Sequence, residues 1–236
     1  MKDSGIPWLG QVPEHWDATK LRYLVKKIVD GAHFTPTYVG EGIPFLRVTD
    51  ISGDGIDLNE VKRIPSLEHQ DLIKRCKPEK GDLLLSKNGT IGIPAVVDWE
   101  WEFSIFVSLC LIKLNERLNV DYTKYVFLSK SIEIQINDGA KQSTVNNLHL
   151  EKIAEFTFPV PPINEQVRIA AELATQTKKI NDLLLDAERA VSLLQERRAA
   201  LISAAVTGKI DVRGLAIKPA AETATTRIRE VSHADL

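Results

Sequence analysis

The most regular arrangement of apolar residues along the chain lies in residues 161–208. Apolar side chains recur there at alternating spacings of four and three, which is the heptad period of a coiled-coil seam. Pro161 and Pro162 suit the first turn of a helix, and Gly208 suits a left-handed cap at its end. No Gly or Pro interrupts residues 163–207. The pattern therefore predicts one continuous helix of about 43 residues, or roughly 60 Å.

The seam of this predicted helix has ten positions, eight of them apolar: Leu173, Thr177, Ile180, Leu184, Ala187, Val191, Leu194, Arg198, Leu201 and Ala205. Because a small domain cannot cover so long a stripe, we expect a coiled-coil spacer and dimerisation helix. The alternative is a helix packed along its own domain. Leu183, Leu185 and Leu193 lie beside the seam and widen it, which favours a contact of more than two strands. The charges on the other faces are mixed, as on a solvated surface.

Residues 1–160 show shorter and irregular patterns, which predict a compact α/β domain of the mixed α+β kind. The expected strands cover residues 43–51, 81–86, 94–97, 102–114 and 155–160, and the apolar residues of the fourth alternate with other side chains at Ile105, Val107, Leu109 and Leu111. The expected helices cover residues 121–137 and 148–153, and residues 20–29 show a helical period that leads into a short strand. After Gly208 the chain becomes rich in Ala and Thr and then polar. We therefore expect a domain over residues 1–160, the long helix over 161–208 and a flexible tail over 209–236.

Composition indicates a reduced, cytoplasmic protein. The 236 residues carry a formal net charge of −2 and contain two cysteines, Cys76 and Cys110, without Cys-x-x-Cys spacing. Such cysteine usage does not suggest a disulfide framework. The first residues lack the apolar core of an export signal, and no run approaches the ~20 apolar residues of a membrane span. Residues 1–160 hold 19 Lys and Arg against 22 Asp and Glu, so total charge neither reveals nor excludes a basic DNA-binding face.

Catalytic motifs are weak throughout the chain. Residues 87–92 form a glycine loop without the Gly-Lys-Ser/Thr ending of a P-loop, so they predict either a strand-connecting turn or a loop that presents polar side chains to a ligand. Glu60 and Lys62, with Asp54 or Asp57 upstream, give a weak metal-nuclease pattern, for which a solvated strand face is the simpler interpretation. The five histidines show no metal-ligand spacing. The chain therefore looks like a binding and assembly protein without a catalytic, metal or cofactor site of its own.

Six segments together resemble the specificity subunits of type I restriction–modification enzymes. They are Trp8-Leu9-Gly10, Pro13-Glu14-His15-Trp16, Pro44-Phe45-Leu46-Arg47-Val48-Thr49-Asp50-Ile51, Gly81-Asp82-Leu83-Leu84-Leu85-Ser86, Phe158-Pro159-Val160-Pro161-Pro162-Ile163-Asn164-Glu165-Gln166, and the helix end from Glu196 to Ile210. Members of this family usually carry two target recognition domains and two long helices. This chain has one of each, so it resembles a half-length subunit.

The resemblance implies a non-catalytic subunit that binds a half-site of a bipartite double-stranded DNA target. It also implies methyltransferase subunits that bring S-adenosylmethionine and a restriction subunit that brings ATP, Mg and the nuclease. Another copy of the chain, or a second and different half subunit, would pair through the long helix. The remaining alternatives are a coiled-coil adaptor that does not bind DNA and the small metal-dependent nuclease.

Candidate DNA contacts are polar residues at strand ends and loops, because such side chains make directional contacts with base edges. They are His33, Thr35, Arg47, Thr49, Lys87, Asn88, Thr90, Lys141, Gln142, Ser143 and Thr144. For each of them, ordinary turn chemistry is the competing interpretation. The candidates for the dimerisation seam are the apolar members Leu173, Ile180, Leu184, Ala187, Val191, Leu194 and Leu201.

Overall fold

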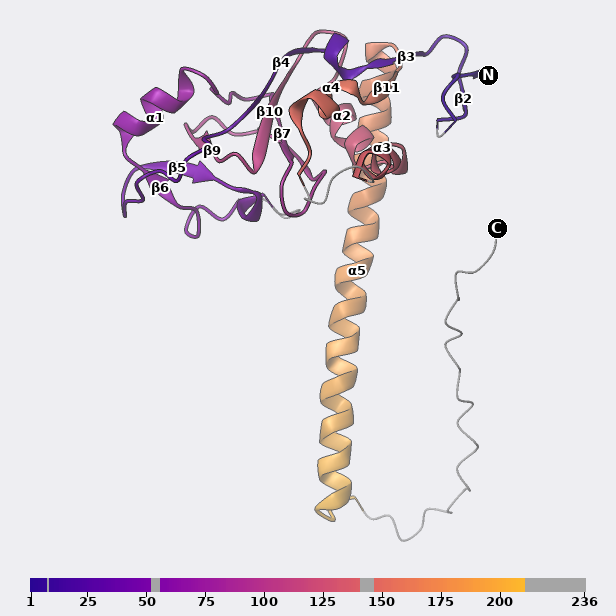
Figure 1. Ribbon diagram of the computed structural model, residues 1–236. Coiled ribbons are helices and arrows are strands. Elements are labelled where there is room, and N and C mark those ends of the chain that lie inside the picture. The colour runs from indigo at the N-terminus through magenta and orange to yellow at the C-terminus, as the bar shows by residue number, and fades with distance from the viewer. Residues whose placement is uncertain (8, 52–55, 141–146, 211–236) are drawn as a thin grey trace. The chain divides into compact units, whose positions relative to one another are not determined.

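A computed structural model describes residues 1–7, 9–51, 56–140 and 147–210 of the chain (Figure 1). The chain divides into two compact units, residues 1–177 and residues 178–236. The first unit holds all the strands and the beginning of the long helix, whereas the described part of the second unit is the remainder of that helix and the turn after it.

A four-stranded antiparallel sheet forms the centre of the first unit, in the order β4 (Val25–Asp30), β10 (Leu109–Leu114), β7 (Leu83–Ser86) and β8 (Pro94–Val96). The strand predicted over residues 102–114 is in fact two strands, because the chain turns between β9 (Ser104–Ile105) and β10. The predicted alternation is also wrong for β10, since Leu109, Cys110, Leu111 and Ile112 are all buried. A strand covered on both faces reads as a continuous apolar run.

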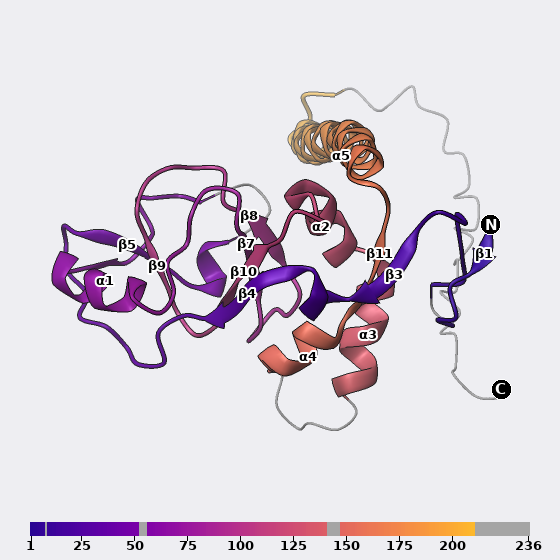
Figure 2. The same ribbon diagram turned by 90° about the horizontal axis from the view of Figure 1, so that it is seen from above.

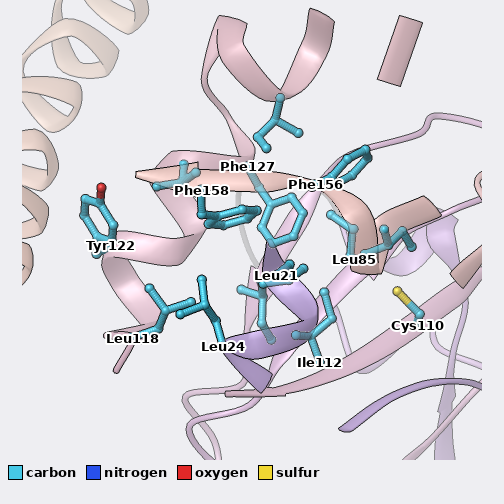
Figure 3. Close-up of a cluster of buried hydrophobic side chains, with 14 of the residues drawn as sticks. Leu21, Leu24, Leu85, Cys110, Ile112, Leu118, Tyr122, Phe127, Phe156 and Phe158 are labelled. Carbon is cyan, nitrogen blue, oxygen red and sulfur yellow. The ribbon is translucent and has the colours of Figure 1, made fainter. Parts of the chain in front are cut away.

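One face of this sheet is covered by three short helices, α2 (Val120–Phe127), α3 (Lys130–Ala140) and α4 (Leu150–Glu155). Their apolar side chains pack with those of β7 and β10 into the larger core (Figure 3). Phe127 and Phe158 meet edge to face there, with ring centroids 5.2 Å apart. Both cysteines, Cys76 and Cys110, are free and buried.

The other side of the central sheet packs against a three-stranded sheet in the order β6 (Arg63–Ile64), β5 (Ile43–Leu46) and β9, and α1 (Ser66–Ile73) lies against β9. Figures 1 and 2 place this smaller sheet and α1 on one side of the central sheet, and α2, α3 and α4 on the other. Two ribbons complete the unit: β1 (Lys2–Asp3) with β2 (Gln11–Val12), and β3 (Asp17–Lys20) with β11 (Thr157–Val160). The mixed α+β class predicted from the sequence is confirmed.

Three local predictions are wrong in detail. Residues 20–29 form a 3-10 turn (Leu21–Tyr23) between two strands, because Leu21 and Leu24 are both fully buried in the core and mimic a helical period. The strand predicted over residues 43–51 ends at Leu46 and continues as a second 3-10 turn (Val48–Asp50). The helix predicted over residues 121–137 is two helices, since Ser129 turns its hydroxyl back to donate to the Val126 carbonyl at 2.6 Å.

The long helix α5 runs from Ile163 to Val206 as the sequence predicts. Glu165 in its first turn accepts hydrogen bonds from the Trp16 indole at 2.9 Å and pairs with the His15 ring at 2.7 Å. The hydrogen bond from Trp16, followed by that from His15, holds the pKa of Glu165 below its ordinary value. At the far end Gly208 has a φ of +72°, and the Lys209 amide donates to the Ala204 carbonyl at 2.8 Å. This is the Schellman cap that a glycine after the last turn predicts.

Gln166 fastens the start of α5 to the rest of the first unit. Its side chain is fully buried and makes three hydrogen bonds of 2.8 Å, each to a main-chain group. It accepts from the Asn119 amide and donates to the carbonyls of Arg117 and Pro161. The beginning of the helix is therefore bound to the start of α2 and to the end of β11.

We expect Gln166→Leu to lower the free energy of unfolding by at least about 2 kcal/mol, because each buried polar group left without a partner costs ~1–3 kcal/mol. Urea unfolding of the purified chain measures this. Gln176→Leu is the matched control on the same helix, since Gln176 is exposed and, among the residues with described positions, its side chain bonds to Glu172 alone. Its effect should stay within about 0.5 kcal/mol, and equal losses in the two variants would contradict the role given to Gln166.

The helix residues of the second unit carry an exposed apolar stripe. Ile180, Leu184, Val191, Leu194 and Leu201 of the seam are each at least half exposed. The neighbouring Leu183, Leu185 and Leu193 are exposed as well. Contiguous apolar surface of this kind marks an interaction site more often than a solvated face. In the part of the chain that the structure describes, no helix has the length and apolar character needed to cross a membrane.

Candidate nucleic-acid interface

The loops that follow β4 and β7 gather at one end of the central sheet, together with the segments that lead into β8 and β10. β4 ends at Asp30 and β7 ends at Ser86, opposite the beginning of β10 at Leu109 and of β8 at Pro94. The end of β5 joins this group, because the Phe106 amide donates to the Leu46 carbonyl at 2.8 Å. The candidate DNA contacts in residues 33–35, 47–49 and 87–90 all follow these strand ends. The structure therefore brings three separate stretches of sequence to one end of the domain.

The Arg47 loop is held in a defined conformation by Asp50. The Arg47 guanidinium donates from Nε to Oδ2 of Asp50 at 3.1 Å and from Nη2 to Oδ1 at 3.0 Å. This hydrogen bonding raises the pKa of Arg47. Thr49 is exposed and also donates to Asp50, and the Val48 amide donates to the Ser108 hydroxyl at 3.1 Å. Arg47 thus lies half-buried with a fixed guanidinium plane, which suits directional contacts to base edges.

The glycine loop after β7 is a tight turn, as one of its two interpretations predicts. The Gly92 amide donates to the Ser86 carbonyl, and the Ile93 amide donates to the Ser86 hydroxyl. Gly89 and Gly92 both have positive φ angles, and a Cβ on Gly92 would lie 2.9 Å from Ile136. The turn therefore requires glycine at these places.

Of the three candidates in this turn, only Thr90 is exposed. Lys87 is buried, and its ammonium lies 3.4 Å from Oδ2 of Asp30. Asn88 is half-buried and pairs with Asn147 in an isolated bridge. In this structure Lys87 accordingly faces the interior, which contradicts the expectation that the loop presents its side chain to DNA.

His33 and Thr35 are exposed on the loop that follows β4. The His33 ring lies 3.0 Å from Oδ2 of Asp30, with more than half of its side chain exposed. The backbone before it is anchored, since the Ala32 amide donates to the Ile105 carbonyl and the Val107 amide donates to the Ala32 carbonyl. The loop thus presents polar groups from a fixed base.

Lys141, Gln142, Ser143 and Thr144 lie outside the described residues. The chain beyond them returns to the same end of the sheet, because the Leu148 amide donates to the Lys87 carbonyl at 2.8 Å.

Sequence reasoning missed three groups that shape this end of the domain. Asp30 is a buried acid bonded to cations from distant segments, Ser108 connects two loops, and Phe34 is 53% exposed between His33 and Thr35. Only Phe34 gave a signal, as an apolar residue in a polar loop. The partners of Asp30 and Ser108 are too distant in sequence to be paired by pattern.

The nuclease pattern finds no geometric support. The Asp57 carboxylate accepts hydrogen bonds from the amide and side chain of Asn59, and Glu60 is exposed. Among the residues with described positions, no group of three or more His, Cys, Asp and Glu lies close enough to hold a metal ion. Asp54 falls outside the described part.

The first unit thus has loops that converge at one end of its central sheet, and the helix residues of the second unit carry an exposed apolar stripe. A family model described as "Type I restriction modification DNA specificity domain" matches residues 13–187. The chain belongs to this family, as its sequence motifs indicate.

Curated relatives agree with this assignment. The chain is 22% identical to the EcoBI specificity subunit of Escherichia coli, over 88% of this chain and 44% of that protein. It is 27% identical to the putative MjaX specificity subunit of Methanocaldococcus jannaschii, over 70% of this chain and 40% of that protein. The chain spans less than half the length of these two relatives.

Solved structures show the same fold. One, described as the basis of complex assembly and conformational transition of the type I R-M system, aligns with 83% of this chain at a TM-score of 0.67 and 20% identity, and 47% of that chain is covered. The HsdS subunit from Thermoanaerobacter tengcongensis aligns with 74% of this chain and 40% of its own length, with a TM-score of 0.52 and 17% identity.

Proposed function

We propose that this chain is a DNA sequence-specificity subunit of a type I restriction–modification system, and that it binds one half-site of a bipartite target. The family match over residues 13–187 carries the proposal. The convergence of the Arg47, Thr90 and His33 loops at one end of the central sheet supplies a surface for base contacts. The chain is a non-catalytic subunit of a cytoplasmic complex.

A non-catalytic subunit needs partner subunits that carry out the methylation and the cleavage of DNA. Methyltransferase subunits dock on the chain and supply S-adenosylmethionine, and a restriction subunit supplies ATP, Mg and the nuclease. The exposed stripe on α5 favours pairing with another copy or with a second half subunit. Two paired chains would bring two recognition domains to one DNA molecule, which matches a bipartite target.

Methylation mapping in cells that co-express the chain with a methyltransferase subunit tests this function. We expect methylation at one defined motif only when the chain is present. Arg47→Met should weaken methylation at that motif about 10- to 100-fold, since a lost base contact costs ~1–3 kcal/mol. Arg117→Met is the matched control. Arg117 also pairs with a carboxylate, Asp17, at 3.3 Å, but it follows β10 at the opposite end of the sheet.

Methylation that does not depend on the chain would refute the specificity role and favour an adaptor without DNA binding. Equal effects of Arg47→Met and Arg117→Met would place the DNA contacts elsewhere on the domain.

A further inference from the structure

Asp30 is a buried acid at the point where the loops of the proposed DNA interface meet. It is the last residue of β4, opposite Cys110 of β10, and is only 6% exposed. Its carboxylate contacts three basic side chains from three separate segments. The His33 ring lies at 3.0 Å, the Arg75 guanidinium at 2.6 Å and the Lys87 ammonium at 3.4 Å.

The negative charge of Asp30 is needed as a counterion for the buried Lys87 ammonium. Burial raises the pKa of the Asp30 carboxyl, but hydrogen bonds from His33 and Arg75 outweigh burial and hold the pKa below its ordinary value of 3.8. Asp30 is therefore ionised at neutral pH. Lys87 is as deeply buried as Asp30, and a buried ammonium without a counterion is strongly unfavourable. The position of the Lys87 side chain thus depends on Asp30.

Lys87 in turn connects the main chains of the other loops. Its amide donates to the Ser108 carbonyl at 2.9 Å, and its carbonyl accepts from the Leu148 amide at 2.8 Å. The Ser108 hydroxyl accepts a hydrogen bond from the amide of Val48, and Val48 is the residue after Arg47. A continuous path of contacts therefore runs from Asp30 through Lys87 and Ser108 to the Arg47 turn.

We propose that Asp30 is a positioning residue of DNA recognition, which fixes the loops that read bases by holding Lys87 inside the domain. This inference rests on the proposed function. Asp30 touches no base, and it acts through Lys87, His33 and the loops that these residues belong to. Asp30 also keeps the Lys87 ammonium away from the surface, where it could contact phosphates of any sequence. Phosphate contacts of that kind raise affinity without adding specificity.

The test uses the complex of the full chain with its methyltransferase subunit and two DNA duplexes, one with the mapped motif and one with the same bases scrambled. Binding is measured between 50 and 200 mM salt for the wild type, Asp30→Asn, Lys87→Met and the double variant. Thermal unfolding of each complex is followed in parallel. Asn and Met preserve the approximate shape of the side chains that they replace.

For Asp30→Asn we expect the ratio of motif to scrambled affinity to fall at least ten-fold. The slope of log affinity against log salt should steepen by about 0.9, the increment for one additional phosphate contact, as Lys87 reaches solvent. For Lys87→Met the ratio should fall while the slope stays that of the wild type. The double variant should regain the wild-type slope and keep the lowered ratio.

Two results would overturn the inference. A lower melting temperature for Asp30→Asn with an unchanged affinity ratio would make Asp30 a purely structural residue. A slope that becomes shallower by about 0.9 in Lys87→Met would show that Lys87 itself contacts phosphate. If Asp30→Asn fails to fold, the Lys87→Met variant still tests the inference. In that variant Asp30 keeps its contacts with His33 and Arg75. Absence of motif preference in the wild type would instead refute the proposed function.

Discussion

Leu184→Asp is expected to convert a paired chain into a monomer. Leu184 lies in the middle of the α5 seam and is 57% exposed in the single chain. A two-fold pair of antiparallel helices would bury this position on both chains at once, because a two-fold interface uses the same patch twice. Each pair would then contain two unpaired carboxylates in an apolar contact, which is costly. Light scattering at micromolar concentration measures the molar mass directly.

Leu193→Asp is the matched control for this experiment. It introduces the same charge at a leucine of the same helix that is 65% exposed and lies off the seam. A two-stranded pair should tolerate it, whereas dissociation would indicate the wider contact that Leu183, Leu185 and Leu193 suggest. A wild-type chain that is already monomeric, and that Leu184→Asp leaves unchanged, would rule out self-pairing and point to a different half subunit.

Removal of one heptad from α5 should shorten the unread gap of the DNA target by about three base pairs. The 44 residues of the helix correspond to about 66 Å. In an antiparallel pair with one recognition domain near each end, that length would set the distance between half-sites. Deletion of residues 180–186 removes roughly 10.5 Å at 1.5 Å per residue, or about three steps of ~3.4 Å. Both half-sites should stay the same, because the deletion leaves residues 1–160 intact.

Methylation mapping reads the gap and the half-sites together. Deletion of residues 179–182 is the informative control, since a loss of four residues puts the two halves of the seam out of register and should abolish pairing. An unchanged gap after the seven-residue deletion would show that α5 does not set the spacing. Changed half-sites would show that the helix takes part in base reading.

The long helix was predictable because its information is local. A heptad pattern with eight apolar positions out of ten, prolines before Ile163 and a glycine at 208 specify its extent without reference to any other segment. The buried strand β7 was predictable for the same reason, as a short apolar run between a glycine and a turn. Such elements need no knowledge of their partners.

The errors concern residues whose environment is tertiary. Leu21 and Leu24 lie a helical turn apart in sequence, but both are buried against α4 and β11 because a 3-10 turn directs them there. The sequence of β10 predicts an alternating strand. In the structure β10 lies between β4 and β7, and other elements cover both faces of the sheet, so all four residues from Leu109 to Ile112 are buried. Periodicity reports which faces are apolar and cannot report how many faces are covered.

The same reasoning applies to the proposed interface. Turn chemistry located the loops after β4 and β7, since polar and glycine residues after strands are visible in sequence, whereas residues 47–49 were predicted as part of a strand. The inward direction of Lys87 was not predictable, because its partner Asp30 is 57 positions away and resembles an ordinary turn residue. The sequence indicates which loops exist, and the long-range ion pair decides which of their side chains reach solvent.

The attachment of α5 to the first unit through Gln166 has a consequence for how such chains can be re-engineered. All three of its hydrogen bonds go to main-chain amides and carbonyls, at Arg117, Asn119 and Pro161. These three hydrogen bonds depend on where the backbone runs at the three residues, and they do not depend on which side chains those residues carry. A foreign recognition module should therefore seat on the α5 of this chain if it has the same backbone path at these three points and also supplies partners for Glu165 in place of Trp16 and His15. Grafts that cut after residue 162 would preserve every one of these bonds.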